Sequence, residues 1–412
     1  MQPIRLKRNS SAKLAELILS DPVNKWVFSS KDAVFLVGGY IRDLFRGIPS
    51  KDRDYVVKGN IKKIASRFAE QFQGTVIMFK KDPICRVILQ DRNIIDFTPL
   101  MGSINENLRH RDFTINALAW SKKSGLIDLH GGVEDIKNRI IRAVRIKNLL
   151  LDPLRILRAY RFGLELGGSI EERTKKALKR YSRQLKKVAP ERITEELFKI
   201  LNHDRSTQYL PYLIEDNVLN TILSLKNSKN SNRLARNIKF LKTFDSFLKV
   251  TSPDVKKQLE EKTSQGITKK GFLRLVLLAG DNDLRFYEKL RLSRNNKKAF
   301  KNVLTAYKLM AGRVTEEKLF EAFMKSQDKA IELSVMICIK KSESPAKIFK
   351  YMNSYLRAVN KPLLNGEDIK TILKIKAGPK IGVVLRAAQK AQFKGLINTR
   401  MQAKKWLVLN FT

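Results

Sequence analysis

Cysteine and histidine are scarce in this 412-residue sequence, with two and three residues, and acidic residues are half as many as basic ones. The two cysteines, Cys85 and Cys338, lie in apolar surroundings, which argues against a disulfide framework or a zinc site and for a reducing compartment. No apolar run approaches the length of a membrane-spanning helix, and the basic segment Met1–Ser11 lacks the apolar core of a signal peptide. We therefore expect a cytoplasmic protein with no membrane partner.

Positive charge is the most prominent property that remains. Lys and Arg number 82 against 40 Asp and Glu, which gives a net charge of +42 and a pI near 10.2. The excess is uneven, because residues 1–150 hold 27 basic and 15 acidic residues whereas residues 151–412 hold 55 and 25. A charged thermophilic surface would balance lysine with glutamate, which this chain does not do. The composition favours a polyanionic partner such as RNA, held mainly by the later part of the chain.

The stretch Phe35–Val57 carries the clearest chemical pattern. An apolar run stops at Gly38 and Gly39, turns into a short helix, and returns as an extended segment that holds Asp52 and Asp54. Residues two apart in a strand point to the same face, so the two carboxylates are expected side by side. Such a pair repels itself unless a cation lies between its members, and oxygen ligands of this kind suit Mg²⁺. Two solvated surface aspartates are the alternative.

The glycine pair favours the metal interpretation. Backbone without side chains can approach a phosphate closely, and the N-terminus of the following helix attracts anions. The stretch, which we call the first motif, resembles that of the class II nucleotidyltransferases, which comprise tRNA CCA-adding enzymes and related bacterial poly(A) polymerases. The resemblance implies that Asp52 and Asp54 hold two Mg²⁺ ions and that Gly38, Gly39 and Arg42 lie at the nucleotide.

The segments on either side of the first motif complete an expected sheet. One amphipathic helix is predicted within residues 1–30, at Ala12–Ser20. A second helix at 61–72 precedes three strands at 75–79, 85–89 and 93–97, the last of which carries Asp96. In a mixed sheet this strand can lie beside the one that holds Asp54. Asp96 is then either a third carboxylate near the metals or a surface aspartate beside a turn.

The stretch Leu108–Trp120, the second motif, reads LRHRDFTINALAW. Arg111, Asp112 and Asn116 recur at helical spacings, so we expect a helix whose polar side chains line the edge of a cleft. A surface salt bridge is the simpler alternative for the Arg-Asp pair. The stretch resembles the family's RRDFTINA motif, which implies that Arg111 and Asp112 read the ribose hydroxyls, with Asn116 nearby. His110 stands where the family often has arginine.

Leu126–Val144 resembles the third motif, in which Gly131 and Gly132 form a tight turn that serves as hinge and scaffold. Pro190–Leu201 resembles the fifth motif, and its apolar residues repeat at core spacing. We expect the fifth motif to brace the preceding helix.

The fourth motif, Leu151–Phe162, begins a helix with Asp152 at the cap position. Arg155, Arg158 and Arg161 follow at intervals of three and form a cationic stripe flanked by apolar residues, and we expect these arginines to bind the nucleotide. A capped basic surface helix is the alternative.

The fourth motif resembles the family's EDxxR sequence. The resemblance implies that Asp152 and Arg155 hydrogen-bond the edge of the incoming base, which would favour C and A over G and U. Leu151 stands at the family's glutamate position, which removes a group that could orient the arginine and puts strict selection of C and A in doubt.

From residue 201 to about 356 the pattern is helix after helix with basic outer faces, as in Asn232–Leu248, Thr268–Ala279 and Glu316–Met324. The segment from Pro362 to Trp406 resembles the C-terminal tail of bacterial members. Lys380 there would hold a tRNA phosphate or mark an ordinary helix junction.

Together these patterns predict an α+β protein whose N-terminal head has a mixed sheet, followed by an all-α remainder. The expected divisions are a catalytic head at 1–145, a helical neck at 146–205, a helical body at 206–356 and a tRNA-binding tail at 357–412. The resemblance implies an enzyme that adds C and/or A to the tRNA 3′ end from CTP and ATP, with Mg²⁺ and release of pyrophosphate. A poly(A) polymerase and a non-catalytic RNA-binding protein are the alternatives. Nothing in the sequence indicates the oligomeric state.

The chain between Asp96 and the second motif is short. Family members that complete CCA use a flexible loop between the first and second motifs to switch from C to A. The short connection predicts that two cytidines are added efficiently and the adenosine poorly. A compact design that still permits the switch is the alternative.

Overall fold

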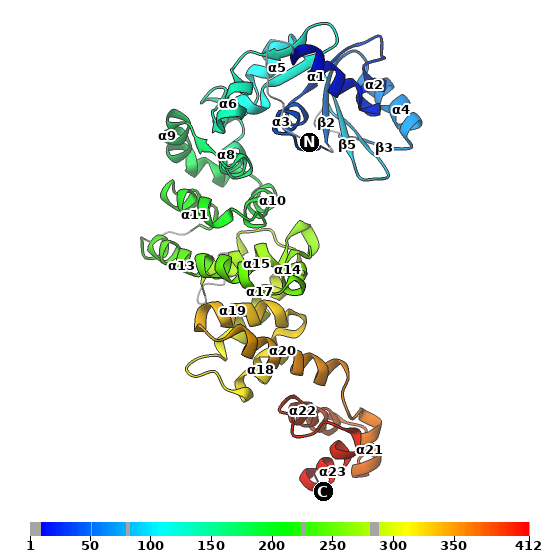
Figure 1. The fold of residues 1–412 in the computed structure, drawn as a ribbon, viewed down its shortest axis with the longest axis vertical. Coiled ribbons are helices and arrows are strands. Elements are labelled where there is room, and N and C mark those ends of the chain that lie inside the picture. The colour runs from blue at the N-terminus through cyan, green and yellow to red at the C-terminus, as the bar shows by residue number, and fades with distance from the viewer. Residues whose placement is uncertain (1–9, 51, 80–82, 225–227, 281–287, 412) are drawn as a thin grey trace. The chain divides into compact units, whose positions relative to one another are not determined.

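We describe the fold from a computed structural model, which covers residues 10–50, 52–79, 83–224, 228–280 and 288–411 (Figure 1). The chain divides into two compact units. Unit 1 comprises Met1–Glu196 and Glu215–Ile222, and unit 2 comprises Leu197–Ile214 and Leu223–Thr412. The division into head, neck, body and tail remains a prediction.

Unit 1 contains a seven-stranded sheet in the order β3-β4-β5-β2-β1-β6-β7. Strands β2 and β5 run parallel, and the other neighbouring pairs run antiparallel. The mixed sheet confirms the α+β class expected for the head. The strands are β1 (Ala33–Val37), β2 (Arg53–Lys58), β3 (Thr75–Met78), β4 (Cys85–Ile88), β5 (Ile94–Pro99), β6 (Leu118–Ser121) and β7 (Gly125–Asp128).

One face of the sheet is aromatic. Leu36 pairs with Tyr55 of β2 and with Trp120 of β6, so the three side chains share this face. Phe28 packs edge-on against Tyr55 and Trp120, and Phe68 of α4 (Ile61–Phe72) lies over the same layer. This face is the core of unit 1, because Leu36, Tyr55 and Phe68 are fully buried.

The opposite face carries a smaller apolar cluster, formed by Val37, Val56, Leu108 and Ala119. Asp54 lies opposite Val37 in the register of β1 and β2 and therefore belongs to this second face. The Asp54 carboxylate therefore lies beside this packed apolar cluster.

Two sequence expectations for unit 1 are wrong. The N-terminal region forms two helices instead of one, α1 (Ser10–Leu19) and α2 (Pro22–Val27), because Asp21 accepts from the backbone of Asn24 and starts a new helix. The second motif is not a helix.

The second motif instead spans the end of α5 (Ile104–Arg109), a single 3₁₀ turn η1 (Thr114–Asn116) and strand β6. Trp120 pairs with Leu36, and Phe113 bridges to Ala143. Pairing with neighbouring strands thus outweighs the helical spacing of the polar residues.

Helices complete unit 1 around a short two-stranded ribbon, β8 (Ile140–Ile141) with β9 (Ser169–Ile170). The fifth motif is helical as expected, and its helix α10 (Pro190–Leu201) crosses the boundary between the units. The remaining helices of unit 1 are α3 (Gly39–Arg46), α6 (Gly132–Asn138), α7 (Asn148–Leu151), α8 (Leu154–Leu166), α9 (Glu172–Tyr181), the 3₁₀ segment η2 (Ser182–Lys187) and α12 (Val218–Ile222).

The described part of unit 2 is helical apart from one isolated bridge, as the sequence predicted. Helices α21 to α23 share a small core of their own, which includes Ile369, Val384 and Leu407. The helices are α11 (Ser206–Glu215, of which Glu215 belongs to unit 1), α13 (Ser228–Val250), α14 (Pro253–Glu260), α15 (Lys269–Ala279), α17 (Arg294–Lys308), α18 (Glu316–Ser326), α19 (Ala330–Lys341), α20 (Pro345–Asn360), α21 (Gly366–Leu373), α22 (Pro379–Phe393) and α23 (Arg400–Phe411), with 3₁₀ turns η3 (Ser264–Gly266) and η4 (Gln327–Lys329).

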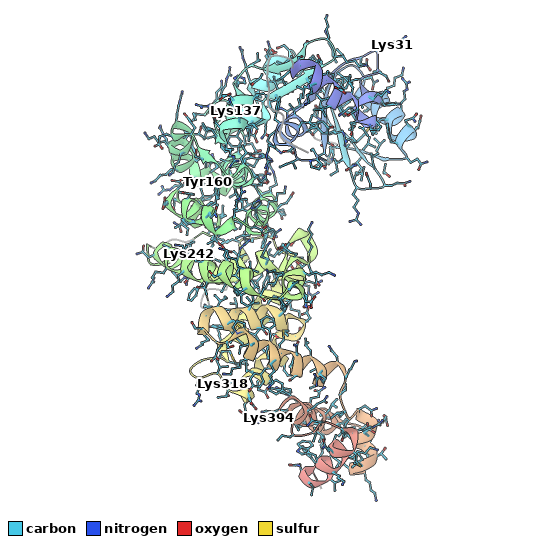
Figure 2. All side chains as sticks on the ribbon, viewed as in Figure 1. Lys31, Lys137, Tyr160, Lys242, Lys318 and Lys394 are labelled. Atoms are coloured by element: carbon cyan, nitrogen blue, oxygen red, sulfur yellow. The ribbon has the colours of Figure 1, made fainter. Side chains whose placement is uncertain are left out.

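Lysine side chains occur throughout both units, as Lys31 and Lys137 in unit 1 and Lys242 and Lys318 in unit 2 illustrate (Figure 2). Among the helices that the structure describes, none is both long and apolar enough to span a membrane.

Candidate active site

Strand pairing brings two aspartates of distant sequence together. Strands β2 and β5 are parallel, and their register sets Asp54 beside Asp96. Asp52 lies just before β2 and is exposed, whereas Asp54 and Asp96 are partly buried. The sequence left the position of Asp96 open between a third carboxylate and a surface group, and the sheet places it next to Asp54.

The surroundings of Asp54 disfavour its ionised form. Burial raises the pKa of Asp54 above its ordinary value, and the charges of Asp96 and Asp52 raise it further, whereas Arg111 and Arg86 oppose the rise. A carboxylate in this position is stabilised by an added positive charge. Asp96 already has one, because Arg86 donates to it from Nε and Nη2 at 2.8 Å each.

Asp52 and Asp54 are suited to a divalent cation. In the described ranges, no three Asp, Glu, His or Cys side chains lie close enough to hold a metal by themselves. Mg²⁺ is commonly held by one or two carboxylates together with substrate phosphates and water, so a pair is sufficient. Asp54 is partly buried and lies near the charges of Asp52 and Asp96, and a bound cation would offset their repulsion.

Gly38 keeps space open beside these carboxylates. Its φ of +75° is a conformation that favours glycine, and it precedes helix α3. A Cβ at this position would lie 3.6 Å from Oδ2 of Asp54 and 3.5 Å from Nη1 of Arg111. The glycine turn, the carboxylate and the arginine therefore meet at one point, although they come from the first and second motifs.

Arg42 joins the first motif to the second. Its Nη1 donates to Oδ1 of Asn116 at 2.7 Å, and its Nε and Nη2 donate to Asp43 at 3.0 Å. Both Arg42 and Asn116 are buried. A Cβ on Gly39 would lie 3.6 Å from the Arg42 guanidinium, an ordinary van der Waals distance, so the path of Arg42 does not itself require glycine there.

Asp112 is buried and fully engaged. Oδ1 accepts from the Phe113 backbone at 2.8 Å and from Asn116 Nδ2 at 3.0 Å, and Oδ2 accepts from Arg158 Nε at 2.9 Å. Burial acts to raise the pKa of Asp112, but Arg158 and these hydrogen bonds outweigh it and lower the pKa below its ordinary value. Asp112 thus holds Arg158 of the fourth motif in place.

The fourth motif presents its polar residues as a connected set. Asp152 follows α7, and its Oδ1 accepts from the Leu154 backbone at 3.3 Å. The N-cap of α8 is Pro153, so the expected position of Asp152 at the helix cap is wrong by one residue. Arg192 of the fifth motif donates to both Asp152 oxygens, at 2.9 and 3.3 Å. Arg155 donates to the Asn148 carbonyl at 3.3 Å, and burial lowers its pKa.

Two further residues complete this region. Leu151 is 67% exposed beside Asp152, so no carboxylate there pairs with Arg155. Arg161 donates to Glu196 of the fifth motif and to Glu165 at 2.7 Å. Contacts with the fourth motif through Arg192 and Glu196 support the bracing role expected of the fifth motif.

The third motif anchors the second. Asp128 accepts from the backbone of Gly132 at 2.8 Å and of Val133 at 2.9 Å at the start of α6. A Cβ on Gly132 would lie 2.2 Å from the Thr114 carbonyl oxygen, so only glycine permits this approach. Asp135 then accepts from the Thr114 hydroxyl at 2.6 Å. These contacts fix the third motif to the second, which agrees with the scaffold role expected of the third motif.

Arg86 is the principal site residue that sequence reasoning missed. It is the single charged residue in the short strand Cys85–Ile88, where Cys85 and Val87 are buried on the other face. A lone arginine between buried apolar residues of a strand was the available signal. Its partner could not be known before the strand order.

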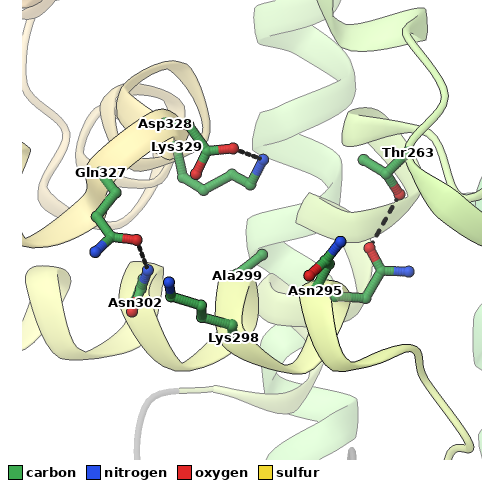
Figure 3. A pocket seen from close by; sticks show the side chains of 9 residues that line it. Thr263, Asn295, Lys298, Ala299, Asn302, Gln327, Asp328 and Lys329 are labelled. Carbon is green, nitrogen blue, oxygen red and sulfur yellow. Dashed lines mark hydrogen bonds and ion pairs between the residues drawn. The ribbon is translucent and has the colours of Figure 1, made fainter.

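A separate cavity of about 420 Å³ lies within unit 2, between α17 and η4 (Figure 3). Its lining is polar, and Asn302 donates across it to Gln327 at 2.9 Å. It holds none of the residues that the sequence singled out.

The comparisons with known proteins agree with this geometry. The model of the Poly A polymerase head domain matches residues 34–102 and 90–142, and that of the probable RNA and SrmB-binding site of polymerase A matches residues 168–227. These matches make the chain similar to the class II tRNA nucleotidyltransferase and poly(A) polymerase family. Enzymes of this family are metal-dependent RNA nucleotidyltransferases that need no nucleic-acid template.

Three similar proteins represent this family. The CC-adding tRNA nucleotidyltransferase of Synechocystis sp. is 27% identical, over 89% of this chain and 91% of its own. The CCA-adding enzyme of Leuconostoc mesenteroides is 32% identical over 50% of this chain and 55% of its own. The structure of the Thermotoga maritima CCA-adding enzyme complexed with tRNA covers 100% of both chains, with a TM-score of 0.74 and 22% identity, which establishes the fold.

Proposed function

We propose that this chain is a cytoplasmic tRNA nucleotidyltransferase that adds C and A residues to the tRNA 3′ end from CTP and ATP. The observation that carries the proposal is the meeting of Asp54, Gly38 and Arg111 at one point, beside Asp52. The similarity to CC-adding and CCA-adding enzymes over most of the chain supports tRNA as the substrate.

Asp52 and Asp54 are the proposed ligands of Mg²⁺. Mg²⁺ bound there would lower the pKa of the RNA 3′-hydroxyl and stabilise the pyrophosphate that leaves. Asp96 forms an ion pair with Arg86 and thereby holds this arginine close to Asp52 and Asp54. No protein side chain is needed as a general base.

The remaining residues position the nucleotide. Gly38 and the N-terminus of α3 leave room for the phosphates, and the guanidinium of Arg111 faces the same space. Asp152 and Arg155 are proposed to read the base edge, with Arg192 fixing the Asp152 carboxylate. Arg111 and Asp112 remain the proposed readers of the ribose hydroxyls. Because Asp112 is buried and accepts from Arg158, it would act on the nucleotide through that arginine.

We further propose that the chain adds two cytidines efficiently and the terminal adenosine poorly. Only four residues, Leu100–Ser103, connect β5 to α5. The side chains of Ser103 and Glu106 form a capping box that fixes the start of α5. Such a connection leaves little chain for a mobile lever. Relatives named CC-adding match 89% to 92% of this chain at 27% to 28% identity, and a relative named CCA-adding matches 90% of it at 24% identity.

Product sequencing tests both parts of this proposal. A tRNA that ends at its discriminator base is incubated with CTP, with ATP, or with both. Addition of two cytidines followed by slow adenosine addition is the expected result. Long adenosine tracts from ATP alone would identify a poly(A) polymerase, and rapid complete conversion to CCA would rule out the restriction to two cytidines.

A further inference from the structure

The ring of Phe162, at the end of the fourth motif, lies among three guanidinium groups. The Cζ atoms of Arg161, Arg42 and Arg158 lie 4.0, 5.1 and 5.1 Å from the ring centroid. Phe162 is 2% exposed and meets Phe113 edge-on at 5.8 Å between centroids. Arg42 comes from α3, and the other two arginines share α8 with the ring.

Three like charges around one buried side chain repel each other unless their surroundings compensate. Each arginine has an acidic partner of its own: Asp43 for Arg42, Asp112 for Arg158, and Glu196 with Glu165 for Arg161. These partners come from separate parts of unit 1. The ring of Phe162, whose π faces are negative, lies within 5.1 Å of all three guanidinium carbons.

The three arginines differ in their access to solvent. The side chain of Arg158 is 33% exposed, whereas those of Arg42 and Arg161 are 10% and 12% exposed. Arg158 is therefore the member of this group that can meet an anionic ligand directly. Arg42 and Arg161 face the ring from positions that are fixed by hydrogen bonds.

We propose that Phe162 is a positioning residue for nucleotide binding, which holds Arg158 toward the nucleoside triphosphate through its π face and together with Asp112. This inference rests on the proposed function, because it assumes that Arg158 faces CTP. It assigns a role to a residue that otherwise would count only as core. A purely packing role predicts that the shape of the ring matters and its electrostatics do not.

The test changes the electrostatics of the ring at nearly constant shape. Phe162 is replaced in the full-length protein by phenylalanines of increasing fluorination, which weakens the negative face step by step. We expect the Kd for CTP with Mg²⁺, measured by calorimetry without tRNA, to rise about threefold to tenfold across the series. The KM for CTP should rise in parallel, while kcat and the tRNA Kd stay close to those of the wild type. The Tm should fall as well, because the buried guanidinium groups of Arg42 and Arg161 lose the same attraction, so CTP binding is measured well below the Tm of every variant.

Phe68 provides the matched control, because its buried ring packs against the aromatic rings of Trp26 and Phe97. The same series at Phe68 should leave CTP binding unchanged. Phe162→Tyr, which keeps an aromatic face, should bind CTP more tightly than Phe162→Leu when both are measured well below their Tm. A CTP Kd that stays constant across the Phe162 series, or rises equally in the Phe68 series, would overturn the proposal. A wild-type protein that binds CTP yet adds nothing to tRNA would contradict the proposed function instead.

Discussion

Unit 1 and unit 2 are nearly equal in length but use positive charge in different ways. Unit 1 holds 39 basic and 24 acidic residues, and unit 2 holds 43 and 16. Around the candidate site of unit 1, arginines are tied to named partners, as Arg42 is to Asn116 and Arg158 to Asp112. In unit 2 many lysines and arginines are exposed on helices, as on α17.

This difference separates two tasks. Paired, buried charges have fixed positions, which a reaction requires. Exposed charges of one sign create an extended positive field, which attracts a polyanion without reading it. We therefore assign the chemistry to unit 1 and most of the RNA affinity to unit 2.

The largest expected effect concerns the carboxylates of unit 1. Asp54→Asn and Asp52→Asn should each lower Mg²⁺-dependent nucleotide addition on the order of a thousandfold, because a metal ion supplies several kcal/mol of transition-state stabilisation. Incorporation of labelled CTP into tRNA is the measurement. Asp91→Asn, on the turn between β4 and β5, is the control and should remain active. Near-normal addition by either site variant would show that the metal assignment is wrong.

A charge reversal in unit 2 should weaken tRNA binding strongly. Arg294, Lys298 and Lys301 are exposed on α17 at spacings of four and three residues. Changing all three to Glu should raise the tRNA Kd by about tenfold or more at physiological salt and flatten its dependence on salt concentration. Fluorescence anisotropy at several salt concentrations provides both quantities.

The matching reversal in unit 1 sharpens this comparison. Lys62, Lys63 and Arg67 are likewise exposed on α4, so their change to Glu alters the net charge by the same amount. We expect a clearly smaller loss of affinity. Equal losses for the two triple variants would mean that the tRNA affinity is not concentrated in unit 2.

A smaller effect is expected at the base-reading residues of unit 1. Asp152→Ala or Arg155→Ala should reduce the preference for CTP over UTP by about tenfold, since one well-placed pair of hydrogen bonds to a base is worth about 1–3 kcal/mol. The measured quantity is kcat/KM for each nucleotide. Unchanged preference in both variants would leave Asp152 as an ion-pair partner of Arg192 and Arg155 as a structural charge.

The smallest effect is one of stability and pH. The pKa of Asp112 is lowered in the folded protein, so its ionised form stabilises the fold above its ordinary pKa of 3.8, and this stabilisation is lost as pH falls through the lowered value. Asp112→Asn should therefore cost about 1–3 kcal/mol at neutral pH. The difference in Tm between wild type and variant should shrink as the pH is lowered to about 3. A difference that is constant with pH would argue against the Asp112–Arg158 pair as its source.

The motifs were predictable because their chemistry is local. Asp52 and Asp54 are two apart, Gly38 precedes a helix, and Arg155, Arg158 and Arg161 follow a helical period, so residue type and spacing, together with the family resemblance, selected them as candidates. The mixed sheet and the helical remainder followed from the same periodic patterns.

What the sequence could not predict is pairing over long distances along the chain. Arg42 and Asn116 are 74 residues apart, and Arg158 and Asp112 are 46 apart. Asp96 became a neighbour of Asp54 only through the parallel pairing of β2 and β5. The polar residues of the second motif have helical spacing, which predicted a helix. The end of the motif is instead strand β6, because it pairs with β1, which is distant in the sequence.

The central claim, that chemistry and RNA affinity belong to different units, is tested most directly by a crossed measurement. The single-turnover rate of CTP addition at saturating tRNA and the tRNA Kd are determined for Asp54→Asn and for the triple reversal of Arg294, Lys298 and Lys301. The account predicts that Asp54→Asn loses the rate and keeps the Kd, whereas the triple variant loses affinity and keeps the rate. Loss of both quantities together in both variants would contradict it.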